Sequence, residues 1–189
     1  TVDDVRFEVV GGQLKLKAGV SFDHESEAGV DVTVTATDAG GLATSQLFTI
    51  AVNDVNEAPT AVSLAGSSVD ENDAGAVVGA LSASDPDAGD SHTYTVDDAR
   101  FEVSAGELKL KASESLDHEA EATVDVTVTA TDAGGLATSQ VFTIAVNDVN
   151  EAPTAISLTG SSVDENDVGA IVGALSASDP DAGDSHTYT

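Results

Sequence analysis

The chain repeats itself with a period of 94 residues. The segment Thr1–Asp4 recurs as Thr95–Asp98, and 80 of the 94 positions in residues 1–94 are identical in residues 95–188. Most of the 14 exchanges are mild, such as Val77 against Ile171. Two copies this similar indicate a recent duplication within a longer array. We therefore expect repeats that each fold as a unit and stack end to end.

The clearest break between structural elements is the segment Asn53–Thr60, which returns as Asn147–Thr154. A proline among polar residues marks such a break. It predicts that 57–150 is one complete unit, 1–56 the back part of the preceding unit and 151–189 the front part of the next. The two partial units are expected to complete one another. Either neighbouring copies along a longer covalent array supply the missing strands, or the front strands of one chain insert into the back part of another.

Alternation of apolar and polar residues with a period of two dominates the complete unit. Val124, Val126 and Val128 alternate with Asp125 and Thr127, which is typical of a strand with one buried face. Turn signals separate such runs, and no stretch has a helical period. The pattern predicts an all-β protein with about seven strands in the unit, near residues 61–69, 76–83, 92–97, 100–104, 107–112, 123–131 and 140–147. Short strands at this spacing favour a two-sheet β-sandwich over a barrel or a β-helix.

The charge balance excludes several kinds of partner. The chain carries 34 acidic and 6 basic side chains, a formal charge of −28. Such a field repels nucleic acid and anionic lipid. There is no Cys, so disulfides, thiolate nucleophiles and Cys-type zinc sites are absent. No apolar run approaches the roughly 20 residues of a membrane span.

Many of the acidic residues gather in short clusters at turns and strand ends. The first repeat has Asp23-His24-Glu25, Asp38, Asp54 with Glu57, Glu71, and Asp85 with Asp87, and the second repeat keeps all of them. The loops of a sandwich converge where strands end. Hard oxygen ligands with few His and no Cys select Ca²⁺ over zinc or copper.

These clusters resemble the calcium-binding motifs of cadherin repeats, in the form found in large secreted bacterial proteins. Asp70–Asn72 resembles the Pro-Glu-Asn motif, and Leu116–Glu119 resembles Leu-Asp-Arg-Glu. Asp85–Asp87 resembles Asp-x-Asp, and Ala130–Asp132 resembles the Ala-x-Asp of a late strand. Asp148–Pro153 is similar to the linker Asp-x-Asn-Asp-Asn-x-Pro but is one residue shorter. The resemblance covers the whole chain, with the motifs in the family's order.

The resemblance implies tandem Greek-key, immunoglobulin-like sandwiches that bind Ca²⁺ where successive domains meet. It assigns to the junction near Asn56 the residues Asp23, Glu25, Asp54, Asn56, Glu57, Asp85, Asp87 and Asp132. It assigns to the junction near Asn150 the residues Glu71, Asp117, Glu119, Asp148, Asn150, Glu151, Asp179 and Asp181. Each junction would also need one ligand from outside residues 1–189.

Other interpretations of the same residues fit less well. Solvated surface acids do not account for clusters that repeat in motif order. An EF-hand starting at Asp85 has Gly89 where an oxygen ligand is needed and Val96 in place of the bidentate Glu. A zincin motif at His24 lacks its second His. His24 and His118 are expected on the surface beside the calcium ligands, and His92 and His186 as ordinary strand residues. No acid, base and nucleophile are assembled, so we expect no enzyme.

We expect a calcium-rigidified segment of an extracellular bacterial structural or adhesive protein, secreted or on the cell surface. Its partners would be neighbouring copies of the same repeat, joined head to tail in a stiff stalk or filament, and other cells or surface polysaccharide. The rival hypothesis is a calcium-dependent polysaccharide-binding module of a biofilm matrix protein. Such a site would need exposed aromatic side chains, and the chain has only seven aromatic residues.

Overall fold

All regular elements of the protein are strands. The computed structural model describes residues 1–189 and contains 14 strands, and it has no helix of the length and apolarity that a bilayer span requires. The chain divides into two compact units. Unit 1 comprises Thr1–Thr60, Ser84–His92 and Thr131–Ala137, and unit 2 comprises Ala61–Ala83, Thr93–Ala130 and Thr138–Thr189.

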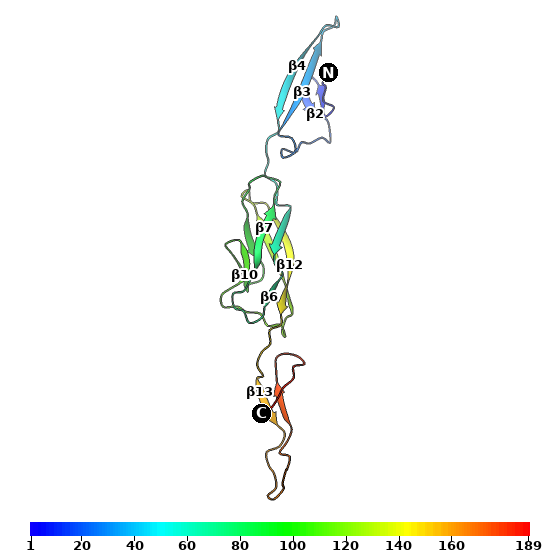
Figure 1. Ribbon diagram of the computed structural model, residues 1–189. Coiled ribbons are helices and arrows are strands. Elements are labelled where there is room, and N and C mark those ends of the chain that lie inside the picture. The colour runs from blue at the N-terminus through cyan, green and yellow to red at the C-terminus, as the bar shows by residue number, and fades with distance from the viewer. The chain divides into compact units, whose positions relative to one another are not determined.

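Unit 1 contains two antiparallel strand pairs. They are β1 (Phe7–Val10) with β2 (Gln13–Leu16), and β3 (Gly29–Thr37) with β4 (Ala43–Ala51). The second pair is the long hairpin in Figure 1, with a register that runs from Gly29 opposite Ala51 to Thr37 opposite Ala43. Its apolar core is small: the buried cluster consists of Phe7, Val30 and Val32, with a few half-buried side chains packed against them.

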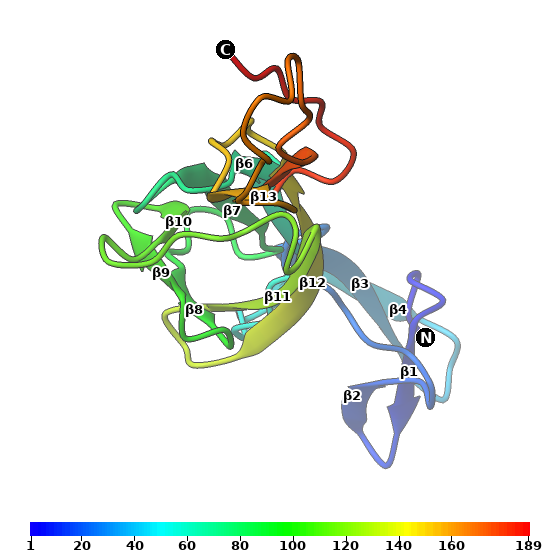
Figure 2. The same cartoon turned by 90° about the horizontal axis from the view of Figure 1, so that it is seen from below.

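Unit 2 contains two four-stranded sheets. Three residues at strand ends, Ser84, Thr131 and Ala137, are the exception, because they belong to unit 1. One sheet has the order β5-β7-β10-β9 and the other the order β6-β12-β11-β8. The strands are β5 (Ala61–Ala65), β6 (Ser68–Asp70), β7 (Val77–Ser84), β8 (Thr93–Val96), β9 (Phe101–Ser104), β10 (Glu107–Leu110), β11 (Thr123–Thr131) and β12 (Ala137–Asn147). Figure 2 shows β9 and β10 across the core from β11 and β12.

The apolar residues of the alternating strands form the core between these sheets. Val124, Val126, Val128 and Ala130 of β11 are all buried there, together with Phe101 and further residues from both sheets. The polar members of the same strands face solvent. The prediction of an all-β tandem sandwich is confirmed, because the period-two pattern gives each sheet one apolar face that only another sheet can cover.

One predicted strand is divided between the two sheets. The sequence indicates a single strand over 61–69, but β5 ends at Ala65 and β6 starts at Ser68. The chain turns at Gly66, whose φ of 141° excludes most side chains, and β6 then pairs parallel with β12. Gly79 permits this crossing, because a Cβ at Gly79 would lie 1.9 Å from the carbonyl oxygen of Ala65. Alternation alone does not show such a change of sheet.

The last part of unit 2 is a single hairpin. β13 (Ala155–Leu158) pairs antiparallel with β14 (Leu175–Ser178), from Ala155 opposite Ser178 to Leu158 opposite Leu175. Its large apolar side chains, among them Ile156 and Leu175, are exposed.

We predict that Gly79→Ala destabilises the sandwich by about 1–3 kcal/mol, the usual cost of forcing extra volume into a close contact. The methyl group would meet backbone, which cannot rotate away. Thermal melts of the full chain measure the effect, with Ala80→Ser on the exposed neighbouring residue as the control. Equal melting temperatures for the two variants would show that the crossing at Gly66 tolerates a side chain at Gly79.

Candidate metal centres

Four carboxylates meet at one end of the sandwich in unit 2. Glu71, Glu119, Glu151 and Asp181 each offer an oxygen, and these oxygens all lie within 4.8 Å of one another. We call this group the four-carboxylate cluster. None of its members forms an ion pair with a Lys or Arg, since the arginines pair elsewhere, as Arg100 does with Asp98 and Glu121. The local negative charge is therefore left uncompensated by the protein.

Glu71 is the fixed member of this cluster. It directly follows β6 and is only 2 % exposed. Its Oε1 accepts the amide of Val149 and its Oε2 accepts the amide of His118, each at 2.7 Å. These backbone hydrogen bonds, from Val149 and then from His118, lower the pKa of Glu71 and keep it ionised. One carboxylate thus connects the end of β6 to the turn at His118 and to the linker.

The concentration of negative charge shows in the pKa of Glu119, another member of this cluster. Burial, and then the neighbouring Glu71, Glu151 and Asp148, raise the pKa of Glu119. Asp181 Oδ2 accepts the amide of Glu151 at 2.7 Å, which holds the two residues together. Without a counter-ion, the cluster brings carboxylates closer than their repulsion favours.

A group of three carboxylates repeats this arrangement in unit 1. Glu25, Glu57 and Asp87 also offer oxygens within 4.8 Å of one another. We call this group the three-carboxylate cluster. Asp87 Oδ2 accepts the amide of Glu57 at 2.8 Å, as Asp181 does with Glu151. Burial, followed by Glu25, Asp87 and Asp23, raises the pKa of Glu57.

Three buried carboxylate oxygens in these clusters have no hydrogen-bond partner. They are Asp87 Oδ1, Glu151 Oε2 and Asp181 Oδ1. A buried polar atom without a partner costs free energy, and an ionised one costs more. In both Asp87 and Asp181 the second oxygen is held by a backbone amide. The donor set therefore fits a hard cation such as Ca²⁺, which takes six to eight oxygens in a flexible geometry.

Asp132 and Asn56 form a further part of the arrangement in unit 1. Asn56 Nδ2 donates to Asp132 Oδ2 at 2.9 Å, and the amide of Leu136 donates to Asp132 Oδ1 at 2.8 Å. Burial alone would raise the pKa of Asp132, but these bonds outweigh it and lower the pKa. Asp132 is buried, whereas its counterpart Asp38 is exposed. The side chain of Asn56 occupies space that a Cβ at Gly134 would fill, 2.3 Å from its Oδ1.

The remaining predicted ligands have local partners. Asp23 accepts the amide and hydroxyl of Ser26, and Asp117 accepts the amide of Ala120, so each closes its own turn. Asn150 Nδ2 donates to the carbonyl of Glu151. Asp54 and Asp148 lie beside His24 and His118 in two further groups of three.

The prediction that His92 and His186 are ordinary strand residues is wrong. Both lie outside the strands, and their Nε2 atoms contact Oδ2 of Asp85 and of Asp179, each at 2.8 Å. The predicted ligands Asp85 and Asp179 are thus each held by a histidine seven residues later. The Asp-x₆-His spacing in both repeats is the signal that could have shown these pairs.

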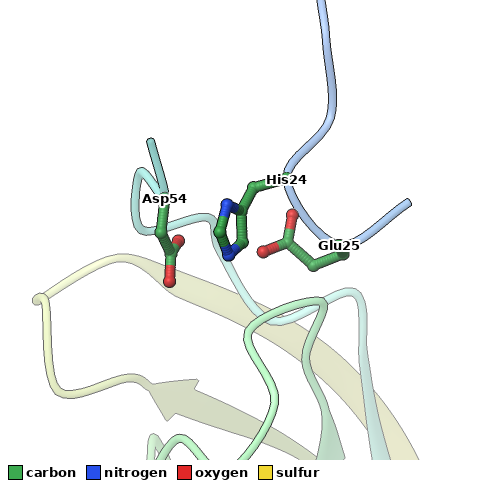
Figure 3. A group of neighbouring side chains, drawn as sticks. All are labelled: His24, Glu25 and Asp54. Atoms are coloured by element: carbon green, nitrogen blue, oxygen red, sulfur yellow. The ribbon is translucent and has the colours of Figure 1, made fainter. Parts of the chain in front are cut away.

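His24 and His118, expected on the surface beside the calcium ligands, occupy matching half-buried positions next to predicted ligands. Figure 3 shows the His24 imidazole between the carboxylates of Glu25 and Asp54. Its Nδ1 contacts the carbonyl oxygen of Val52 at 2.7 Å, and His118 contacts that of Val146 at 2.6 Å. The hydrogen bond to the carbonyl and then the nearby acids raise the pKa of both rings, against the effect of burial. Each histidine orients the turn that carries Glu25 or Glu119.

We predict opposite effects of Glu119→Gln with and without calcium. In EDTA the neutral amide removes repulsion, so the melting temperature rises. With excess Ca²⁺ it removes a charged ligand, so the calcium dissociation constant increases at least about tenfold, because ligand charge sets affinity at such sites. Calorimetric titration and melts of the full chain measure both.

The matched control is Glu107→Gln, the same charge change at an exposed position of β10. Its counterpart in the first repeat is already a glutamine, Gln13. We expect Glu107→Gln to leave both the melting temperature in EDTA and the calcium affinity close to those of the wild type. Equal behaviour of the two variants would contradict the cluster assignment.

Comparison with known proteins identifies the type of domain. No protein-family model matches the chain. Protocadherin gamma-C4 of Pan troglodytes and of Homo sapiens are each 32 % identical to it over 177 residues. This alignment covers 85 % of the chain but 19 % of each relative, so the chain spans about a fifth of the length of the curated relatives it matches.

Solved structures agree with the fold. Extracellular cadherin domains 1–4 of Protocadherin Gamma B7 match with a TM-score of 0.74 and 23 % identity, over 97 % of this chain and 50 % of that one. The extracellular domain of Protocadherin GammaB4 matches with a TM-score of 0.67 and 26 % identity, over 97 % of this chain and 32 % of that one. These neighbours are extracellular domains, in agreement with the predicted location. Sequence and fold together show that the chain consists of cadherin-like repeat domains.

Proposed function

We propose that the chain is a calcium-rigidified segment of an extracellular adhesive or structural protein, built as a tandem array of cadherin-like domains divided near Asn56 and Asn150. The observation that carries this proposal is the set of buried carboxylate oxygens without partners at both junctions. The mammalian relatives support an adhesive role. We further propose that the whole protein is a large secreted bacterial adhesin or biofilm protein that forms a stalk or filament, because the motifs resemble the cadherin repeats of such proteins.

The proposed ligands are the two carboxylate clusters. Glu71, Glu119, Glu151 and Asp181 would hold Ca²⁺ near Asn150, and Glu25, Glu57 and Asp87 would hold it near Asn56. Bound Ca²⁺ would supply the positive charge that both clusters lack. The linker residues Glu57 and Glu151 are already joined by their amides to Asp87 and Asp181. Sharing a cation would therefore couple each linker to the loops on either side of it. The role is mechanical rather than catalytic.

Polysaccharide binding does not become a second candidate. A sugar platform needs a group of exposed aromatic rings. Phe7 and Phe101 are buried, and Tyr94 and Phe142 pack against the core. The two exposed rings, Phe48 and Tyr188, belong to different segments of the chain. The comparisons add no observation in its favour.

We predict that calcium stabilises the fold. A ligand that binds only the folded state contributes about 2.7 kcal/mol at a hundredfold excess over its Kd. Melts of the full chain in EDTA, in about 1 mM Ca²⁺ and in equal Mg²⁺ test this, since Mg²⁺ demands a stricter octahedral geometry. We expect the melting temperature to rise with Ca²⁺ more than with Mg²⁺. A melting temperature that is the same in EDTA and in Ca²⁺ would contradict the proposed stabilisation by calcium.

We also predict that calcium narrows the distribution of distances across the linker near Asn56. Because the chain has no Cys, spin labels can be placed selectively at Ser45→Cys on β4 and Ser139→Cys on β12, both exposed positions. Pulsed electron resonance should give a broad distribution in EDTA and a narrow one in Ca²⁺. Adding Asp87→Asn should restore breadth in Ca²⁺. A distribution that calcium leaves unchanged would contradict rigidification.

A further inference from the structure

Two groups of side chains combine one histidine with two carboxylates. They are His24, Glu25 and Asp54 in unit 1, and His118, Glu119 and Asp148 in unit 2. We call each group a His-Glu-Asp site. In each site one ligand atom from every member lies within 4.8 Å of those from the other two. Because one of these atoms is a ring nitrogen, the sites differ chemically from the clusters that offer only carboxylate oxygens.

Hydrogen bonding fixes which nitrogen of each ring can bind a ligand. Nδ1 of His24 contacts the carbonyl oxygen of Val52, and Nδ1 of His118 contacts that of Val146. A carbonyl oxygen can only accept, so Nδ1 carries the proton and donates it. In the neutral ring the lone pair is therefore on Nε2. In Figure 3, Nε2 of His24 is the lower ring nitrogen and lies between the two carboxylates of its site.

The three ligand atoms of each site are thus all electron-pair acceptors when the ring is neutral. The hydrogen bonds of His24 and His118 involve Nδ1 and leave Nε2 without a partner. The lysines and arginines that form ion pairs do so with other acids. A histidine that binds a metal typically donates its second N–H group to a backbone carbonyl or a carboxylate, as these two rings do. The rings are half-buried and the carboxylates exposed, so an ion from solvent can reach each site.

We infer that each His-Glu-Asp site binds a divalent transition metal of the zinc type, through Nε2 of the histidine and one oxygen from each acid. Imidazole nitrogen suits Zn²⁺, Cu²⁺ and Ni²⁺, whereas Ca²⁺ takes oxygen ligands. Three protein ligands leave the fourth position of a tetrahedral zinc ion open for water. The histidine therefore gives these sites a metal preference that the carboxylate clusters do not have.

The two kinds of site share a carboxylate, and this part of the inference rests on the proposed function. Glu119 belongs to both the four-carboxylate cluster and a His-Glu-Asp site, and Glu25 belongs to both the three-carboxylate cluster and the other one. A carboxylate bound to zinc has less charge to offer calcium, and two nearby dications repel each other. Zinc would therefore weaken calcium binding at both junctions, and calcium would weaken zinc binding by the same factor. The stiffness that calcium gives the linkers would then respond to a second metal.

Nitrogen NMR of isotope-labelled histidine side chains in the full chain tests the zinc sites. Spectra are recorded above neutral pH, because protons compete with the metal for Nε2. Adding Zn²⁺ should shift the Nε2 resonances of His24 and His118. The remaining histidines of the chain, His92 and His186, are internal controls that should shift little, since their Nε2 atoms already contact a carboxylate. Equal shifts of all the rings, or no shift of any ring, would overturn the inference.

The double variant His24→Asn with His118→Asn separates metal binding from the orientation of the turn. Asparagine keeps an N–H group near the position of Nδ1, where it can donate to the backbone carbonyl, but it removes Nε2. We expect calorimetric titration to show a Kd for Zn²⁺ that is at least about tenfold higher than in the wild type, the usual lower bound for damage to a metal site. An unchanged zinc affinity would show that Zn²⁺ binds elsewhere and would overturn the sites.

Calcium titrations with and without saturating Zn²⁺ test the coupling. Zinc should raise the Kd for calcium at least about fivefold in the wild type and leave it unchanged in the double variant. An unchanged Kd in the wild type, or equal effects in both proteins, would overturn the coupling through these sites. Absence of calcium binding at both junctions would refute the proposed function, while the NMR shifts caused by Zn²⁺ still decide whether the His-Glu-Asp sites bind metal.

Discussion

The pairing of β6 with β12 is the interaction on which both the core and the candidate metal centre depend. It places Val69 opposite Val146 in the core and carries the chain directly to Glu71, whose own amide donates to the carbonyl of Asn147. A short parallel strand thus places a core side chain and a candidate ligand within three residues of each other. Glu71 lies between the amides of His118 and Val149 only because the break at Gly66 lets β6 join the second sheet.

Repulsion between the carboxylates opposes the arrangement of strand ends that brings them together. Folding gathers carboxylates at the strand ends without bringing a Lys or Arg to them, and burial with mutual repulsion raises the pKa of Glu57 and Glu119. Backbone amides fix one oxygen each of Asp87 and Asp181 and leave the other buried without a partner. A cation that binds oxygen ligands, as proposed above, would remove this cost at both positions. Stability and the stiffness of the linkers are therefore expected to depend on the same ion.

The near identity of the repeats allows a direct comparison of sequence and context. The segment Ser67–Asp73 and its copy at 161–167 are identical in sequence, yet only the first contains a strand. The difference is the presence of a paired edge, because a strand of three residues gains too few hydrogen bonds to persist alone. Local sequence here specifies what can pair, and the neighbouring strands decide whether it does.

The sequence by itself determined the all-β class, most strand positions, the buried valines of β11 and the clustering of acids at strand ends, because period two and turn residues act over short distances. Its motif order also predicted Glu25, Glu57, Asp87, Glu71, Glu119, Glu151 and Asp181 as ligands, and the structure brings these together in two clusters. Only the tertiary structure decided that 61–69 is split between sheets, and that His92 and His186 hold Asp85 and Asp179. It also decided which carboxylate oxygens are left without partners. The split strand and the oxygens without partners depend on how distant strands are spaced across a core, and no local pattern in the chain encodes that spacing. The histidine contacts are local, and only the repeated Asp-x₆-His spacing could have indicated them.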